Sequence, residues 1–203
     1  AAALGMDLPI GTPSGNMVLS LGAGTVQAAV LAMYGIVAAD SQRAGGMQLD
    51  EAIVSYVRKK FGLIIGTATA EKVKLELGTA VRQEEERSIE IQAQDQVSGL
   101  PRSLNLTNDD VMEALTDTLK SFVETARKVL EKTPPELVSD IIDRGVAICG
   151  GGAYLPGIDR LMTRELGVPA YLVDNPTTCI AEGAALALDA NIFPKIQRNL
   201  PPI

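Results

Sequence analysis

A glycine-rich turn near the start of the chain, Gly22-Ala23-Gly24-Thr25, has residue types that suit phosphate binding. A phosphate needs backbone N–H groups that point toward it and a backbone without bulky side chains, and this turn offers both, together with the Thr25 hydroxyl group. No Lys-Ser or Lys-Thr pair follows, and the next expected element is a strand, so the turn is neither a P-loop nor a dinucleotide fingerprint. An ordinary hairpin turn remains the alternative interpretation.

A second glycine-rich turn, Gly150-Gly151-Gly152-Ala153, follows the apolar run "VAIC" and precedes an expected helix. Three consecutive glycines let a flat ligand or a phosphate approach the backbone, and the N-terminus of a helix favours negative charge. A tight strand-to-helix turn would need only one glycine. Both interpretations, a ligand contact and a plain turn, stay open at this point.

Glu71 and Lys74 form a third candidate, within the predicted helix "TATAEKVKLELG". They stand three residues apart and therefore share one helical face. They could contact a ligand together, or they could form an ion pair in solvent. Thr69 is the expected N-cap of this helix and Gly78 its end.

The composition of the chain excludes several kinds of site. The 203 residues include no histidine, which removes the commonest general base, the usual catalytic triads and most transition-metal sites. A net charge of −7 argues against nucleic acid as a partner, because phosphate contacts need clustered lysine and arginine. Cys149 and Cys179 fit no zinc spacing and suit a reducing cytoplasm. No apolar run reaches the ~18 residues of a membrane span.

The elements that must position these residues follow from the hydrophobic pattern. Apolar runs separated by short glycine turns predict a β-meander. Its three strands are expected at 17–21, 27–33 and 36–42. A helix is expected at 50–60, where Asp50 is a suitable N-cap. Alternating polar and apolar residues between 80 and 106 predict a small antiparallel sheet with one solvated face.

The second half of the chain alternates helices and strands. An apolar stripe in "TNDDVMEALTDTLKSFVETARKVLEK" predicts a long helix, with Thr107 and Asp110 as its capping box. The segment "GVAICGGGAYLPGIDRLMTRELGVPAYLV" predicts strand, turn, helix and strand, and a last helix is expected at 176–190. This order favours an α/β fold, in which a mixed sheet is flanked by helices. A small α+β lobe at 46–106 is inserted, and 1–16 forms a linker.

Several stretches of the chain, taken in order, resemble the MreB family, the bacterial actins of rod-shape determination. They include "GTATAEKVKLELG", "LEKTPPELVSDIIDRG" and "GGGAYLPGIDRL", and the resemblance runs from Ala1 to about Phe193. It implies an actin/Hsp70-like ATPase fold (ribonuclease H-like), of which this chain would be the second half. It assigns 17–45 and 107–203 to subdomain IIA and 46–106 to the inserted subdomain IIB. Because the chain opens with alanine and has no initiator methionine, we expect the first half to precede it in a longer protein.

In that family ATP, with Mg²⁺, lies in a cleft between the two halves. The resemblance places the second phosphate loop of the cleft at Ala23, Gly24 and Thr25. It places adenosine contacts on two further segments, and these are Glu71, Lys72, Val73, Lys74, Gly150, Gly151, Gly152 and Ala153. It assigns no catalytic and no metal-ligating residue to this half. The first phosphate loop, and the carboxylate that positions the attacking water, belong to the other half.

The resemblance also implies a nucleotide-dependent cytoskeletal protein for cell shape, which forms head-to-tail filaments in the bacterial cytoplasm. The implied partners are further copies of the same protein, the missing N-terminal half, and membrane proteins of wall synthesis. Membrane attachment in the family comes mainly from the first half. We therefore expect no direct membrane binding by this chain, and membrane association only through the filament.

This sequence departs from the family's D-I-G-G-G-T-T-E pattern at the second phosphate loop. Ser20 stands where the family has the Asp that helps to hold hydrated Mg²⁺, and Ala23 replaces the middle glycine. Gln27 replaces the final acid of the pattern, and Met47 replaces an acid near the ribose. These changes imply impaired or lost ATP hydrolysis, and the chain alone is expected to be inactive. The alternatives are a non-hydrolysing pseudo-actin scaffold, or a lobe of another actin/Hsp70-superfamily ATPase.

Overall fold

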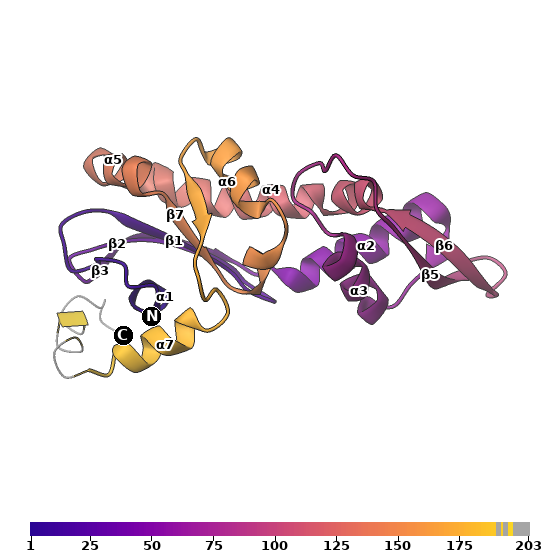
Figure 1. Ribbon diagram of the computed structural model, residues 1–203, viewed down its shortest axis with the longest axis horizontal. Coiled ribbons are helices and arrows are strands. Elements are labelled where there is room, and N and C mark those ends of the chain that lie inside the picture. The colour runs from indigo at the N-terminus through magenta and orange to yellow at the C-terminus, as the bar shows by residue number, and fades with distance from the viewer. Residues whose placement is uncertain (190–191, 193–194, 197–203) are drawn as a thin grey trace.

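The computed structural model describes residues 1–189, 192, 195 and 196, and Figure 1 shows an elongated molecule with a sheet toward each end. The larger sheet has five strands in the order β3-β2-β1-β7-β8. These strands are β1 (Asn16–Leu21), β2 (Val26–Ala32), β3 (Gly35–Gln42), β7 (Val146–Cys149) and β8 (Ala170–Leu172). The first three pair antiparallel, while β7 pairs parallel with both β1 and β8. The expected meander and mixed sheet are confirmed.

Helices cover the larger sheet on one side. The longest, α4 (Asn108–Lys132), packs on β2 and β3, and its N-terminus has the expected capping box of Thr107 and Asp110. Its buried stripe contains Leu115, Leu119 and Phe122, which is the spacing that the sequence predicts. The same side holds α5 (Pro135–Arg144) and α6 (Ile158–Leu166), visible above the sheet in Figure 1. Among the described residues, no helix is both long and apolar enough to cross a membrane.

The smaller sheet lies within the segment expected to be an inserted lobe. Its order is β4-β5-β6, with β4 (Leu63–Ile64), β5 (Ser88–Asp95) and β6 (Pro101–Thr107). The β5–β6 hairpin matches the alternation that the sequence predicts, whereas the two-residue β4 is too short to leave a pattern. Two helices, α2 (Gly46–Phe61) and α3 (Thr67–Leu77), pack against each other in this part of the molecule. The division of the chain into subdomains IIA and IIB stays a prediction.

Both capping residues expected for these two helices were wrong. The N-cap of α2 is Gly45, whose amide donates to the Gln48 side chain at 2.7 Å. Asp50 lies inside α2, where it forms a tertiary ion pair that the local sequence does not reveal. The N-cap of α3 is Gly66, and Thr69 lies within the helix. The C-terminal end of α3 at Gly78 agrees with the prediction.

The segment 1–16 is more ordered than a linker. It contains a short helix, α1 (Ala2–Gly5), which packs against α7 (Cys179–Leu186) beneath the larger sheet (Figure 1). The two helices touch through glycine: a Cβ atom on Gly5 would lie 1.8 Å from the Cys179 carbonyl oxygen. The linker interpretation was therefore wrong for α1. The last helix is also shorter than the expected 176–190, and residue 190 lies outside the described residues.

Candidate functional site

A cavity of about 380 Å³ lies where the larger sheet meets α2 and α3. All three segments that the sequence singled out contribute to its lining. The predicted site residues that line it are Ala23, Glu71, Lys74, Gly151 and Gly152. Residues that the resemblance did not assign to the site line it as well, and these are Gly22, Gly46, Met47, Leu49, Asp50, Leu75, Tyr154, Leu155 and Pro156.

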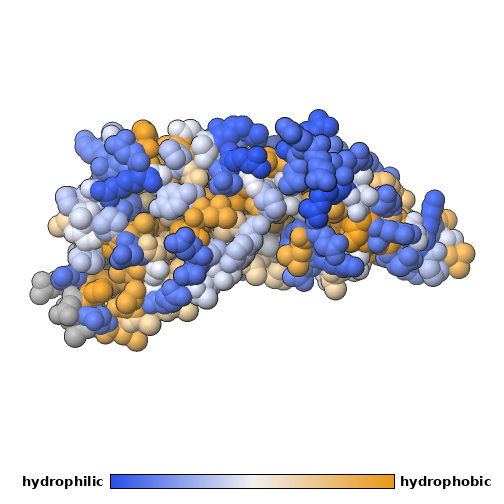
Figure 2. All heavy atoms as spheres, in the orientation of Figure 1, coloured by the Kyte–Doolittle hydropathy of each residue, from blue (hydrophilic) through white to orange (hydrophobic). Residues whose placement is uncertain are grey.

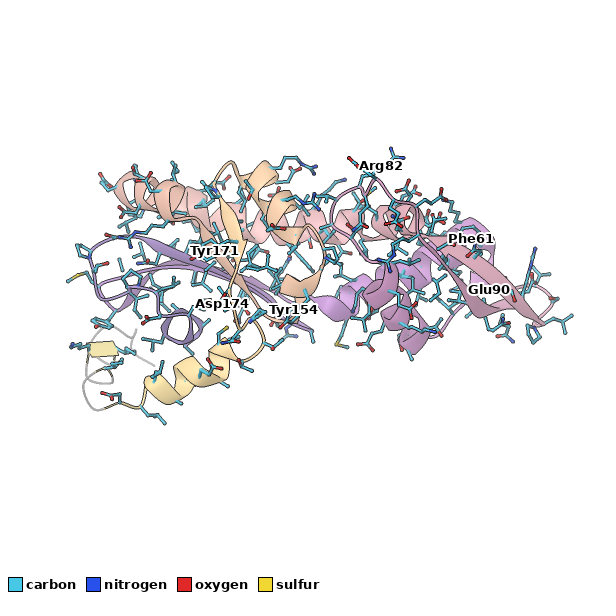
Figure 3. The ribbon with its side chains drawn as sticks, in the orientation of Figure 1. Phe61, Arg82, Glu90, Tyr154, Tyr171 and Asp174 are labelled. Carbon is cyan, nitrogen blue, oxygen red and sulfur yellow. The ribbon has the colours of Figure 1, made fainter. Side chains whose placement is uncertain are left out.

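Sheet topology explains why two turns so far apart in sequence reach one cavity. β1 and β7 are adjacent parallel strands, with Ser20 opposite Cys149. Their carboxyl ends therefore lie at the same edge of the sheet, which is where α/β proteins commonly bind ligands. The Gly22–Thr25 turn follows β1, and the glycines that follow β7 lie beside it. Figure 3 shows Tyr154, just after those glycines, at the junction between the sheet and α2.

The first turn presents free backbone donors. Its hairpin closes through a hydrogen bond from the Gly22 amide to the Thr25 carbonyl oxygen at 2.8 Å. The amides of Ala23, Gly24 and Thr25 donate to no acceptor among the described residues. A Cβ atom on Gly24 would meet nothing within 4 Å, so the backbone is open on that side. Consecutive free amides of this kind can bind an anion.

The carbonyl oxygens of this turn are used differently from its amides. Those of Gly22 and Ala23 accept hydrogen bonds from the amides of Gly46 and Met47, at 3.0 and 2.8 Å. These two donors open α2, where amides have no partner inside the helix. The turn is thus fixed on the start of α2 by its carbonyl groups. Its N–H groups remain available.

The second turn divides its glycines between packing and access. Gly150 has φ +86°, and a Cβ atom there would lie 2.4 Å from the Leu21 carbonyl oxygen. A Cβ atom on Gly152 would lie 2.7 Å from the Leu21 side chain, whereas one on Gly151 would meet nothing within 4 Å. The amides of Gly151 and Gly152 donate to no acceptor among the described residues, as expected at the start of the 3₁₀ helix η1 (Gly151–Tyr154).

Lys74 carries the ammonium group of the cavity, and its partner is not the expected Glu71. Its Nζ atom lies 2.7 Å from Asp50 Oδ1 and donates to the Gly46 carbonyl oxygen at 3.1 Å. The two side chains are only 14% and 12% exposed, so each charge compensates the other where water is scarce. Asp50 Oδ1 receives no hydrogen bond from the described residues, which leaves the ion pair as its compensation. The pair joins α2 to α3 and fixes the ammonium group at the cavity wall.

Besides Gly150, five other predicted site residues lie outside the cavity lining. Val73 and Ala153 are fully buried in the core, and Lys72 is exposed and pairs with Glu76 at 3.8 Å. Gly24 and Thr25 lie in the first turn but outside the lining. Helix geometry accounts for the split within α3, because positions 71 and 74 share a face that 72 and 73 do not.

The chemistry of the lining favours binding over reaction. It contains no serine, threonine, cysteine or histidine that could act as a nucleophile beside a base. Its carboxylates are Glu71 and Asp50, and Asp50 is already paired with Lys74. Among the described residues, no group of three acidic, histidine or cysteine side chains could hold a metal ion. Met47, 57% exposed at the rim, adds an apolar side chain.

The sequence of this chain is similar to known cell-shape proteins. The family described as MreB/Mbl protein matches residues 1–194. The chain is 47% identical over 191 residues to the cell shape-determining protein MreB of Pasteurella multocida, and 43% identical over 188 residues to Mbl of Bacillus subtilis. Each match covers 93% of this chain, and 54% and 56% of the relatives. The chain therefore spans about half the length of the curated relatives it matches.

The structure is also similar to solved structures. MreB5 of Spiroplasma citri, crystallised with ADP and with AMPPNP, superposes with a TM-score of 0.89 in both cases, at 31% and 32% sequence identity. Each match covers 98% of this chain and 60% of that one. A double helical filament of MamK superposes with a TM-score of 0.71 at 18% identity, which supports the fold alone. The expected actin-like α/β fold is confirmed.

Proposed function

Because this chain belongs to the MreB/Mbl family, we propose that it forms one wall of an adenine-nucleotide cleft in a filament-forming cytoskeletal protein that determines cell shape. One observation carries the proposal: two glycine turns with free amides flank a cavity that also holds the Lys74 ammonium group. Free backbone amides bind phosphate in proteins, and the ammonium group adds a positive charge to the same cavity. The MreB5 relative was crystallised with ADP and AMPPNP, which supports the same class of ligand here.

The proposed roles follow from the position of each group. The free amides of Ala23, Gly24 and Thr25 bind the phosphates. Gly151 and Gly152 offer a flat backbone surface to the nucleoside, and Glu71 and Lys74 contact it from α3. Of the other predicted residues, Gly150, Val73 and Ala153 act by shaping the wall, and Lys72 has no contact with the ligand.

Mg²⁺ fits this wall less well than the nucleotide does. Ser20 offers a hydroxyl group at the end of β1, and the lining supplies no carboxylate beyond Glu71 and the paired Asp50. We therefore propose that the ion is bound by phosphate oxygens and by groups outside this chain. Bound there, it would neutralise phosphate charge. This chain alone would not hydrolyse ATP.

A second candidate function is a non-hydrolysing scaffold, a pseudo-actin that assembles without turning over nucleotide. Ser20 and Met47 favour it, because neither can replace a carboxylate near an ion or a ribose. In either case we propose head-to-tail self-association in the bacterial cytoplasm, with membrane proteins of wall synthesis as further partners.

Nuclear magnetic resonance tests the nucleotide proposal, since it detects weak binding by half of a cleft. We expect MgATP at millimolar concentration to shift the amide resonances of Ala23, Gly24, Thr25, Gly151 and Gly152. The amide of Gly167, at the C-terminal end of α6, should not shift. Shifts confined to other regions would refute the site.

Two matched lysine substitutions on one helix sharpen this test. Lys74→Met removes the ammonium group from the cavity wall and should reduce the MgATP-dependent shifts. Lys72→Met changes the same residue type on the exposed face of α3 and should leave them unchanged. Equal effects of the two variants would exclude a direct role for Lys74.

A further inference from the structure

Cys149 and Cys179 lie together although 29 residues separate them in sequence. Cys149 is the last residue of β7 and is fully buried, and Cys179 is the first residue of α7 with an exposed fraction of 1%. Both are free thiols and belong to one small apolar cluster, together with Ala3, Ile10 and Val18. The cluster lies between the larger sheet and the α1–α7 pair that Figure 1 shows beneath it.

Backbone contacts hold the two cysteines in place. The Pro176 carbonyl oxygen accepts a hydrogen bond from the Gly150 amide at 2.7 Å and one from the Cys179 thiol at 3.6 Å. This one carbonyl oxygen therefore links Cys179 to Gly150, the residue that follows Cys149. Cys179 and Ser20 also lie close enough to Cys149 to influence the pKa of its thiol. Two buried cysteines of one cluster, both held through the same carbonyl group, are suitable candidates for a disulfide.

We propose that Cys149 and Cys179 form a redox-sensitive pair, whose disulfide joins the carboxyl end of β7 to the start of α7. A diazene such as diamide is a suitable oxidant. One thiolate adds to the N=N bond, and the second thiolate then attacks the bound sulfur and releases the hydrazine. The two thiols lose two hydrogen atoms and two electrons, and the N=N bond takes them up.

Burial controls the rate of this reaction. Burial, together with the neighbouring Cys179, raises the pKa of Cys149 to about 11, so few thiolates exist in the closed state. α7 packs mainly against the four-residue α1 and exposes Ile180 and Leu186, and Figure 2 shows apolar side chains gathered in this region. Local opening of this short helix would expose the two thiols to the oxidant. Once one sulfur has reacted, the second is already beside it.

The bond would fix a part of the chain that non-covalent contacts alone now hold. It would hold Pro176 over the Gly150 amide, next to the second glycine turn of the cavity. Closing a loop between these cysteines restricts the unfolded chain, so the oxidised protein should melt at a higher temperature than the reduced one. The inference does not depend on nucleotide binding.

The test counts thiols in the 203-residue chain. The reduced protein is treated with diamide, unfolded, alkylated and weighed by mass spectrometry. We expect that neither thiol can be alkylated after oxidation, and that the chain weighs two hydrogen atoms less than the reduced, unalkylated chain. Digestion should give a cross-linked pair of peptides that contain Cys149 and Cys179. Dithiothreitol should restore both thiols, and the melting temperature should fall back.

Single variants serve as controls for pairing. Cys149→Ala and Cys179→Ala should each keep one alkylatable thiol after the same treatment, with no rise in melting temperature. Persistence of both thiols in the wild-type chain after long exposure would overturn the proposal. So would disulfides that join only different copies of the chain, seen as dimers on a non-reducing gel; this outcome needs no variant to fold.

Discussion

The two glycine turns of the cavity look alike in sequence but use their glycines for different purposes. In the turn after β1, Gly24 has open space around it, and Ala23 is tolerated at the centre. In the turn after β7, Gly150 and Gly152 approach Leu21 too closely for a side chain. The first turn keeps its amides free because only its carbonyl groups are fixed on α2, whereas the second turn needs glycine because the neighbouring strand β1 leaves no room for a side chain.

This difference shows that a glycine-rich motif does not by itself report on a ligand. Of the three glycines after β7, only Gly151 is not required by packing, and it lines the cavity. Around the first turn the closest approach is made by a glycine outside the motif. It is Gly45, at the start of α2, where a Cβ atom would lie 2.5 Å from the Gly22 carbonyl oxygen.

Gly150→Ala should have the largest effect on stability. Alanine would have to adopt the positive φ of Gly150, and its methyl group would clash with the Leu21 carbonyl oxygen. Together these two effects should lower the free energy of unfolding by about 4 kcal/mol. Gly151→Ala is the matched control and should change it by only about 0.5 kcal/mol. Urea denaturation measures both. Similar losses for the two variants would remove the distinction between packing and access.

Asp50→Ala should have the next largest effect, because it leaves the Lys74 ammonium group unpaired. Loss of one partner from a buried pair costs several kcal/mol, and some exposure of both side chains reduces this to about 3 kcal/mol. Glu71→Ala, on the same cavity wall but without an ion-pair partner among the described residues, should cost much less. If Asp50→Ala is neutral, the pair does not hold α2 against α3.

Gly45→Ala tests how the first turn is fixed. The added methyl group must push the Gly22 and Ala23 carbonyl groups away from α2, which should cost about 2 kcal/mol. The backbone of Gly45 is extended, so no conformational strain contributes. Denaturation gives the cost. A crystal structure should show the turn displaced from the Gly46 and Met47 amides; an unmoved turn would contradict the proposed attachment.

Ala23→Gly should have the smallest effect on stability and the most specific effect on binding. Extra freedom in the unfolded chain should cost about 0.5 kcal/mol. Loss of the methyl group gives a phosphate closer access to the backbone, so the resonance shifts caused by MgATP should saturate at a lower nucleotide concentration. Unchanged or weaker binding would mean that Ala23 does not obstruct the phosphates.

Local patterns predicted the elements more successfully than their ends. The three meander strands, the β5–β6 hairpin and α4 with its capping box appear where alternation and capping residues indicate them. The N-caps of α2 and α3 were wrong because Asp50 serves a tertiary contact and Gly45 and Gly66 begin the helices. α1 was missed, since four residues leave no period and its stabilising contacts come from α7.

The sequence by itself determined the α/β order, the two glycine turns and the placement of Glu71 and Lys74 on one helical face, because these depend on neighbours a few residues apart. Only the tertiary structure decided which of those groups meet. The parallel pairing of β1 with β7 brings the two glycine turns to one edge of the sheet. Lys74 forms its ion pair with Asp50 of α2 and not with Glu71 of its own helix. Contacts between segments far apart in sequence depend on how whole elements pack, and a pattern of a few residues does not specify that packing.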